Sequence, residues 1–377
     1  MESTGPNPYP RAEARGAGGF RAVVRLAAAL GVVLLVCVGG AGVAQVETHV
    51  PAPVAGAKSV TIERITVHSP SIEGNLEGES PDRPVIVVLP PSYAQQPRRR
   101  YPVVYALHGY SIGAEQWIKE IHVPQTVEGA FAKGAQEMIV VLPDSKTIHN
   151  GSMYSSSATT GDFESFVARD LVRYIDGRYR TIPARASRGL VGHSMGGYGA
   201  TRIGMKHADV FGALYIMSPC CLSPRDPAQL KPEDVAALEA AKSVDETTRL
   251  GFGQRAMLAS AAAWSPNPRK PPLYLDLPLE DGKVRADVAA KWAANAPLAF
   301  VDQYIADLRR YRAIAMDVGD QDGLRFDARK LHETLDAYGV DNGFEIYPGT
   351  HTSDVAFRFQ DHVLPFFSRH LEFSAKR

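Results

Sequence analysis

The sequence predicts an α/β fold in which helices cover both faces of a mostly parallel central sheet. Short apolar runs of strand length alternate along the chain with stretches of helical spacing, which is typical of parallel sheets. One apolar run ends in Gly192-His193-Ser194-Met195-Gly196 and passes directly into small residues that a helix accepts. This pattern is typical of a nucleophile elbow, a tight turn from strand to helix that exposes one serine hydroxyl. Hydrophobic residues make up 45% of the chain, which provides ample core.

The other expected elements follow in chain order. Strands are predicted at 59–67, 84–89, 103–107, 138–142, 213–217, 313–318 and 344–347. Helical spacing predicts one helix over 120–133 and another after Asp162, whose side chain can cap its first turn.

One long segment interrupts this alternation. It separates the strands at 213–217 and 313–318, and it is too long for a structureless loop. It contains proline-rich stretches at 224–232 and 265–278 and helical stretches at about 233–242, 253–263 and 296–310. We therefore expect a helical insertion at about 222–311, before the penultimate strand, that belongs to the same domain and could roof the site.

The N-terminal segment has the features of a secretory signal. Basic residues precede an apolar run over about 26–43 that ends in small residues. We expect cleavage after about Ala44, a linker over 45–57, a catalytic domain over 58–374 and a periplasmic or extracellular protein. The alternative is an uncleaved helix that anchors the protein in a membrane. Without that helix, no stable membrane association is expected.

Composition narrows the possible partners. The 41 Lys and Arg residues balance the 41 Asp and Glu residues, which argues against nucleic-acid binding. Neither a metal-ligand spacing nor a phosphate-binding glycine loop is present, so no metal and no cofactor are expected.

Beyond the signal, the cysteines are the neighbours Cys220 and Cys221, which cannot form a disulfide framework. We expect two half-buried thiols there, with a vicinal disulfide as the less favoured alternative. The oligomeric state is left open.

A serine nucleophile needs a base within hydrogen-bond reach, and the base needs an acid to orient it. In α/β hydrolases the acid and then the histidine follow the serine along the chain. His351 lies in a loop directly after the last expected strand, where such folds build their ligand crevice. The other histidines after Ser194 fall in expected helices. His351 is therefore the predicted base.

The acid is expected after the penultimate strand, where three carboxylates compete. Asp317 is part of the strand itself and is expected to lie too deep in the sheet to reach the histidine. Asp320 and Asp322 both lie in the following turn, where capping and turn chemistry are the ordinary roles of such residues. We favour Asp322, which immediately precedes a helix, and keep Asp320 as the alternative acid.

An oxyanion hole needs two backbone N–H donors. The first expected donor is the amide of Met195, directly after the serine. The second is the amide of Tyr110, because Leu107-His108-Gly109-Tyr110 follows an early strand and the glycine lets the chain turn toward the serine. We expect His108 to brace this loop rather than act as a base.

These motifs resemble the "Putative esterase" family of α/β hydrolases. The resemblance runs from about residue 59 to 372 and rests on the segments 88–93, 101–109, 192–197, 319–322 and 349–351. The family includes feruloyl and acetylxylan esterases, S-formylglutathione hydrolases, enterochelin-type esterases and mycolyltransferases. The resemblance implies an α/β-hydrolase fold and a triad of Ser194, Asp322 and His351, with oxyanion donors at Tyr110 and Met195.

The resemblance leaves the substrate open, and we expect a small-molecule or carbohydrate ester. Trp117 and Tyr154 are candidate walls of the substrate pocket, with ordinary packing as an equal alternative. Trp264 and Trp292 could contact a sugar or an aromatic acyl group, although packing within a helical lid is favoured.

The predicted function is therefore an exported serine carboxylic-ester hydrolase that works through an acyl-enzyme. The alternative enzyme is an acyltransferase of the mycolyltransferase kind, in which a sugar hydroxyl replaces water as the acceptor. A catalytically inactive binding protein on the same scaffold is less favoured, because every member of the triad and the oxyanion glycine are present.

Overall fold

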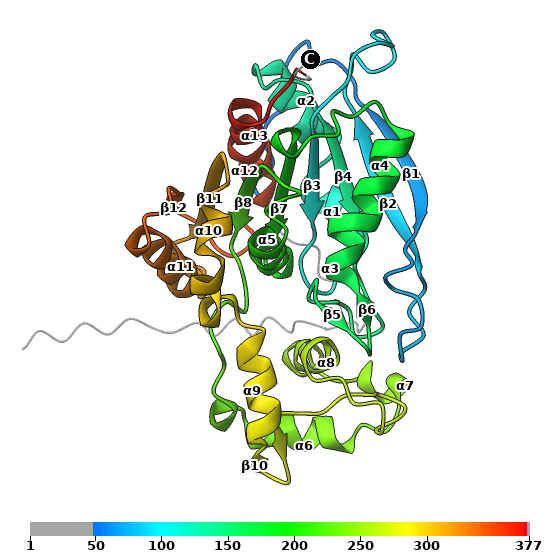
Figure 1. Cartoon of the computed structure of the whole chain (residues 1–377), viewed down its shortest axis with the longest axis vertical. Coiled ribbons are helices and arrows are strands. Elements are labelled where there is room, and N and C mark those ends of the chain that lie inside the picture. Colours follow the sequence, from blue (N-terminus) through cyan, green and yellow to red (C-terminus); the bar gives the residue numbers. More distant parts are fainter. Residues whose placement is uncertain (1–47, 375–377) are drawn as a thin grey trace, which may run out of the picture. The chain divides into compact units, whose positions relative to one another are not determined.

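The computed structural model describes residues 48–374 and is built around an eight-stranded sheet (Figure 1). Six neighbouring strands are parallel, while β2 runs antiparallel to both of its neighbours, the edge strand β1 and β4. In spatial order the strands are β1 (Thr61–His68), β2 (Asp82–Leu89), β4 (Ile139–Pro143), β3 (Val103–Leu107), β7 (Arg188–His193), β8 (Ala213–Met217), β11 (Ala313–Gly319) and β12 (Gly343–Tyr347). The expected α/β architecture with a mostly parallel sheet is confirmed.

The central strands are apolar along their whole length because both faces of the sheet are covered. Every residue of β3, β4 and β8 is buried. Along β3 the side chains alternate between two cores: Val103, Tyr105 and Leu107 face one, and Val104 and Ala106 face the other. Each core needs its own layer of helices, so helices lie on both faces of the sheet.

The first core lies under helices that follow β6 (Gly161–Asp162), β7 and β11. They are α3 (Phe163–Ser165), a π-helical stretch (Phe166–Leu171), α4 (Val172–Arg178), α5 (Met195–Lys206) and α11 (Arg325–Ala337). The expected cap is present, because the Asp162 carboxylate accepts a hydrogen bond from the Ser165 amide at 2.9 Å. A short 3-10 turn (Arg185–Ser187) leads into β7.

The second core lies under α1 (Ala114–Glu120), α2 (Gln125–Ala132), α12 (Val355–Arg358), a π-helical stretch (Phe359–Val363) and α13 (Leu364–His370). The helix predicted over 120–133 is confirmed as α2, but its predicted start is wrong. Helix α1 ends at Glu120, and α2 begins at Gln125 with Pro124 as its N-cap residue. Proline has no amide hydrogen with which to continue a helix from the N-terminal side, so α2 begins only after Pro124.

The segment between β8 and β11 forms helices and two short strands, as expected of an insertion. Its elements are a 3-10 turn (Pro227–Gln229), α6 (Pro232–Ala240), α7 (Val244–Thr247), α8 (Phe252–Trp264), β9 (Leu279–Glu280), β10 (Lys283–Val284) and α9 (Ala286–Ala294). Helix α8 lies against β5 (Ser156–Ser157), where the Ser157 hydroxyl donates to the Ala262 carbonyl at 2.6 Å (Figure 1). Through this contact the insertion is attached to the loop that precedes α3.

The helix predicted over 296–310 is wrong in detail. Three short helical turns replace it: Pro297–Ala299, Val301–Tyr304 and α10 (Ile305–Leu308). Phe300, between the first two turns, has φ −138° and ψ 5°, which no regular helix adopts. Helix α9 was not expected from the sequence.

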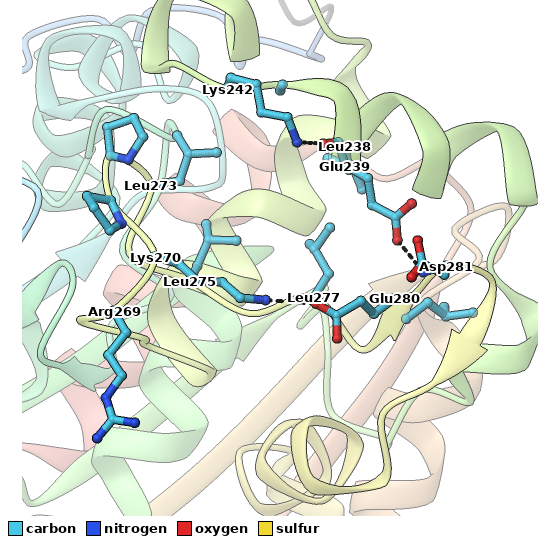
Figure 2. A pocket seen from close by; sticks show the side chains of 14 residues that line it. Leu238, Glu239, Lys242, Arg269, Lys270, Leu273, Leu275, Leu277, Glu280 and Asp281 are labelled. Atoms are coloured by element: carbon cyan, nitrogen blue, oxygen red, sulfur yellow. Dashed lines mark hydrogen bonds and ion pairs between the residues drawn. The ribbon is translucent and has the colours of Figure 1, made fainter.

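The insertion contains a cavity of about 570 Å³ between α6 and the segment 269–281 (Figure 2). Its apolar wall consists of Leu238, Leu273, Leu275, Leu277 and Leu279. Charged residues surround this wall, and Lys270 binds Glu280 at 3.0 Å. None of the candidate catalytic residues lines this cavity.

The predicted signal and the first three residues of the predicted linker lie outside the described residues. Residues 48–51 contact the body of the fold: the His49 ring stacks on Phe357 at 5.2 Å, and Pro51 is buried. Within residues 48–374, no helix combines the length and apolar character needed to cross a membrane.

Candidate active site

Ser194 occupies a strained turn between β7 and α5. Its backbone has φ 58° and ψ −114°, a conformation that costs a non-glycine residue on the order of 1–3 kcal/mol. Glycines make the turn possible: a Cβ on Gly192 would lie 2.0 Å from the Gly196 carbonyl oxygen, and a Cβ on Gly196 would lie 2.1 Å from the Leu107 carbonyl oxygen. The geometry is that of the nucleophile elbow predicted from the sequence.

Hydrogen bonds on both sides hold the strained residue. The Ser194 amide donates to the Met217 carbonyl at 3.1 Å. The Ser194 carbonyl accepts from the amides of Tyr198 at 3.0 Å and Cys220 at 3.1 Å. The end of β8 and the loop after it therefore fix the backbone from which the candidate nucleophile projects.

His351 and Asp322 are brought together from two different post-strand loops. The Nδ1 atom of His351 lies 2.7 Å from the Asp322 carboxylate. The Asp322 side chain is 4% exposed, whereas that of His351 is 35% exposed. Burial raises the pKa of Asp322, but hydrogen bonds from His351 and the Leu324 amide outweigh it, so the pKa lies below its ordinary value. Asp322 therefore stays ionised and can hold the imidazole with Nδ1 protonated.

The two competing carboxylates have other partners. Asp320 accepts a hydrogen bond from the Gly349 amide at 3.0 Å, so it braces the loop that carries His351. Asp317 is fully buried and pairs with Arg358 at 2.8 Å and with the Tyr215 hydroxyl at 2.7 Å. The geometry favours Asp322 over Asp320 as the partner of His351.

The described residues contain no hydrogen bond between Ser194 and His351. Catalytic hydrogen bonds are often long in the absence of substrate and shorten when it binds. The two residues are nevertheless joined through His193, whose Nε2 donates to the His351 carbonyl at 2.8 Å. A carbonyl can only accept, so Nε2 of His193 carries the proton.

His193 is a site residue that the sequence reasoning missed. Its ring lies between two others, with centroids 4.7 Å from the His351 ring and 5.9 Å from the Trp117 ring. Burial and the neighbouring His351 lower the pKa of His193 to about 3, so its ring stays neutral. The available signal was its position beside Ser194 in the elbow, but its partner lies in a loop far along the chain.

The expected oxyanion donors lie on either side of Ser194. Met195 opens α5, and Tyr110 follows Gly109, whose added Cβ would come within 3.5 Å of the Ser194 Cβ. Within the described residues, neither the Met195 amide nor the Tyr110 amide donates to another part of the protein. An oxyanion hole requires two amide donors that the protein itself leaves unpaired.

His108 braces the loop that carries Tyr110, as expected. Its Nδ1 donates to the Gly109 carbonyl at 2.8 Å, and its Nε2 accepts from the Ser145 amide at 2.8 Å. Burial lowers the pKa of His108 and keeps the ring neutral. Both nitrogens are engaged, so the ring is not free to move a proton.

The candidate pocket walls Trp117 and Tyr154 lie in the core instead. Trp117 is 1% exposed, and Tyr154 is fully buried, with its hydroxyl donating to the His108 carbonyl at 3.0 Å. Neither side chain offers a surface to a ligand, so the packing alternative describes them. Trp264 and Trp292 are also buried, and their indole N–H groups donate to Ser155 and Ser265.

An exposed aromatic residue occurs where the insertion approaches the site. Phe252 begins α8 and is 68% exposed. Its ring meets that of Tyr110 edge-on, with centroids 5.3 Å apart. This contact places an apolar group of the insertion beside one of the expected oxyanion donors.

The fold and the elbow together define an α/β hydrolase. A comparison with protein-family models finds that residues 80–361 match the family described as "Putative esterase". The chain therefore belongs to this family of hydrolases.

Solved structures give the same fold. A ferulic acid esterase is 24% identical, with a TM-score of 0.60, over 83% of this chain and 100% of its own. FphF of Staphylococcus aureus, a fluorophosphonate-binding serine hydrolase, is 16% identical, with a TM-score of 0.56, over 84% and 99%. An S-formylglutathione hydrolase of Agrobacterium tumefaciens is 15% identical, with a TM-score of 0.52, over 85% and 99%.

Proposed function

We propose that this hydrolase is a serine carboxylic-ester hydrolase that works through an acyl-enzyme on Ser194. The observation that carries the proposal is the 2.7 Å hydrogen bond between His351 and the buried Asp322, in a structure whose elbow presents Ser194 nearby. An ordinary surface histidine would not need an ionised, buried carboxylate as its partner. A base oriented in this way is what a serine nucleophile requires.

In the proposed reaction, the Ser194 hydroxyl oxygen attacks the ester carbonyl carbon while Nε2 of His351 takes the hydroxyl proton. Asp322 holds the resulting imidazolium through Nδ1–H. The amides of Met195 and Tyr110 donate to the oxyanion of the tetrahedral intermediate. His351 then gives its proton to the leaving alcohol, and a water molecule activated by the same histidine releases the acid from Ser194.

For the substrate, we propose an ester whose acyl or alcohol part carries an apolar or aromatic group. The exposed Phe252 ring beside Tyr110 offers a surface for such a group. The structural relative that is a ferulic acid esterase supports an aromatic acyl group in particular. A comparison of acetyl, butyryl and feruloyl esters of one alcohol would rank these possibilities by kcat/KM.

The hydrolysis of p-nitrophenyl acetate tests the reaction. Ser194→Ala is expected to lower kcat at least about a thousandfold, because the nucleophile is lost. Circular dichroism and the melting temperature serve as controls for folding. A folded Ser194→Ala protein with wild-type turnover would contradict the proposal.

The choice of acid has its own test. Asp322→Asn is expected to lower kcat by about three to four orders of magnitude, because the amide no longer stabilises the imidazolium. Asp320→Asn is the matched control, since its hydrogen bond goes to the Gly349 amide, and it should cost less than about tenfold. Equal losses in the two variants would contradict the assignment of Asp322.

We also propose that the protein is exported. The support is the basic stretch and apolar run that precede Ala44 in the sequence. N-terminal sequencing of protein recovered from outside the cytoplasm is expected to begin near Gln45. A chain that stays in the membrane fraction and starts at Met1 would favour the uncleaved anchor.

A further inference from the structure

Cys220 and Cys221 lie in the loop after β8, next to the backbone of Ser194. Both thiols are half-buried and reduced, and their Sγ atoms are hydrogen-bonded at 2.7 Å. Nη2 of Arg225 lies 3.2 Å from Sγ of Cys221. The proposed esterase reaction uses none of these three side chains.

The surroundings make the two sulfurs chemically different. A guanidinium in contact with a sulfur favours the thiolate over the thiol. The hydrogen bond with Cys220 and the charge of Arg225 together outweigh burial, so the pKa of the Cys221 thiol is lowered. The same hydrogen bond, followed by burial, raises the pKa of the Cys220 thiol. Cys221 is therefore the nucleophile, and Cys220 keeps its proton until Cys221 has reacted.

We propose that this pair is a thiol–disulfide exchange site that regulates Ser194. The Cys221 thiolate attacks one sulfur of a small disulfide, forms a mixed disulfide and expels the other half as a thiolate. The Cys220 thiol then loses its proton to solvent, attacks Sγ of Cys221 and expels the second thiolate. The small disulfide is reduced to two thiolates, and the cysteine pair is oxidised to a vicinal disulfide.

Closing this small ring acts on the backbone beside the elbow, because the ring includes the peptide that joins the two cysteines. The Cys220 amide donates to the Ser194 carbonyl at 3.1 Å, and Cys221 has φ 61°. One residue further on, Leu222 accepts a hydrogen bond from the Leu298 amide of the insertion at 2.9 Å. A ring closed at this point shifts the Cys220 amide, which holds the backbone of Ser194, so the oxidised form is expected to turn over esters more slowly.

The exchange chemistry can be tested without measuring esterase activity. Full-length protein carrying Cys37→Ser, so that only these two thiols remain, is treated with dithiobis(nitrobenzoate) under native conditions. Release of two nitrothiobenzoate ions and a final mass lower by two hydrogens is expected. Cys220→Ser should release one ion and keep one adduct, while Cys221→Ser should react at least about tenfold more slowly. Two retained adducts, or no reaction in the native protein, would overturn the exchange site.

The effect on Ser194 rests on the proposed function and is measured separately. Oxidation is expected to lower kcat for p-nitrophenyl acetate at least about tenfold, with recovery after dithiothreitol. The double variant Cys220→Ser, Cys221→Ser should keep its activity under the same oxidation. An oxidised protein with unchanged kcat would overturn the regulation. If the reduced protein hydrolyses no ester, the proposed function fails, while the mass measurement still decides the exchange chemistry.

Discussion

The nucleophile elbow and the insertion differ in how closely other atoms pack against their backbones. In the elbow, backbone contacts leave no space: a Cβ on Gly192 or Gly196 would lie 2.0 or 2.1 Å from a carbonyl oxygen. In the insertion, a Cβ on Gly253 or Gly282 would meet nothing within 4 Å. The elbow therefore depends on particular residue types, whereas the insertion depends on apolar packing that many sequences provide.

Ion pairs show the same contrast. Beside the elbow helix α5, Arg202 binds Glu164 at 2.7 Å, with side chains 7% and 13% exposed. In the insertion, Arg249 binds Asp245 at 3.1 Å, with side chains 75% and 80% exposed. A broken pair leaves an uncompensated buried charge in the first case and a solvated charge in the second.

Matched glycine substitutions should give the largest difference between the two regions. Gly196→Ala is expected to lower the free energy of unfolding by about 3 kcal/mol or more and to abolish ester hydrolysis, because the opposing atoms belong to the backbone. Gly253→Ala should raise the free energy of unfolding by about 0.5 kcal/mol, since alanine favours a helix. Urea denaturation measures both values. Similar destabilisation by the two variants would break the comparison.

Matched carboxylate substitutions should give the next largest difference. Glu164→Gln is expected to cost about 3 kcal/mol, because it leaves Arg202 buried without its partner. Asp245→Asn should change the free energy of unfolding by less than about 0.5 kcal/mol. A cost of less than about 1 kcal/mol for Glu164→Gln would show that the pair beside the elbow is solvated after all.

The same carboxylate predicts a pH dependence. Burial raises the pKa of Glu164, but His207, Arg202 and Lys206 outweigh it and lower the pKa to about 2. A carboxylate whose pKa is lowered by folding stabilises the protein above its unfolded pKa, and this stabilisation is lost as the pH falls toward the folded pKa. The wild-type protein should therefore lose stability between about pH 4.5 and about pH 2. In Glu164→Gln, the slope of unfolding free energy against pH should be smaller over that window.

The smallest predicted effect concerns His193. His193→Phe keeps a ring between Trp117 and His351 but loses the hydrogen bond to the His351 carbonyl at 2.8 Å. We expect kcat to fall about tenfold with KM unchanged, which corresponds to about 1.4 kcal/mol. His332→Phe, on the outer helix α11, is the control and should leave kcat unchanged. A change in KM alone would argue against a positioning role.

Sequence reasoning succeeded where short-range rules decide the structure. The strands at 103–107 and 213–217 agree to the residue, because fully buried strands are continuous apolar runs bounded by polar or turn residues. The elbow was visible because its glycines flank the serine at a fixed spacing within one short motif. The helix predicted over 120–133 was given too early a start, because helical spacing continued across Pro124 while α2 begins at Gln125.

The remaining features depend on contacts between distant residues. Asp320 and Asp322 lie in one turn, and only the position of the His351 loop distinguishes their partners. The role of His193 depends on a carbonyl in that same loop. Trp117 was a reasonable pocket residue by type, but its place in the core is set by the packing of α1 on the sheet.

The most direct test of the central claim is covalent labelling of Ser194 by a fluorophosphonate, followed by peptide mass analysis. The native protein is expected to carry one adduct, on the peptide that contains Gly192 to Gly196. Labelling should disappear in Ser194→Ala and in heat-denatured wild-type protein, and it should slow at least about a hundredfold in His351→Ala. An adduct on another residue, or equal labelling of the native protein and the His351→Ala variant, would contradict an activated serine at the elbow.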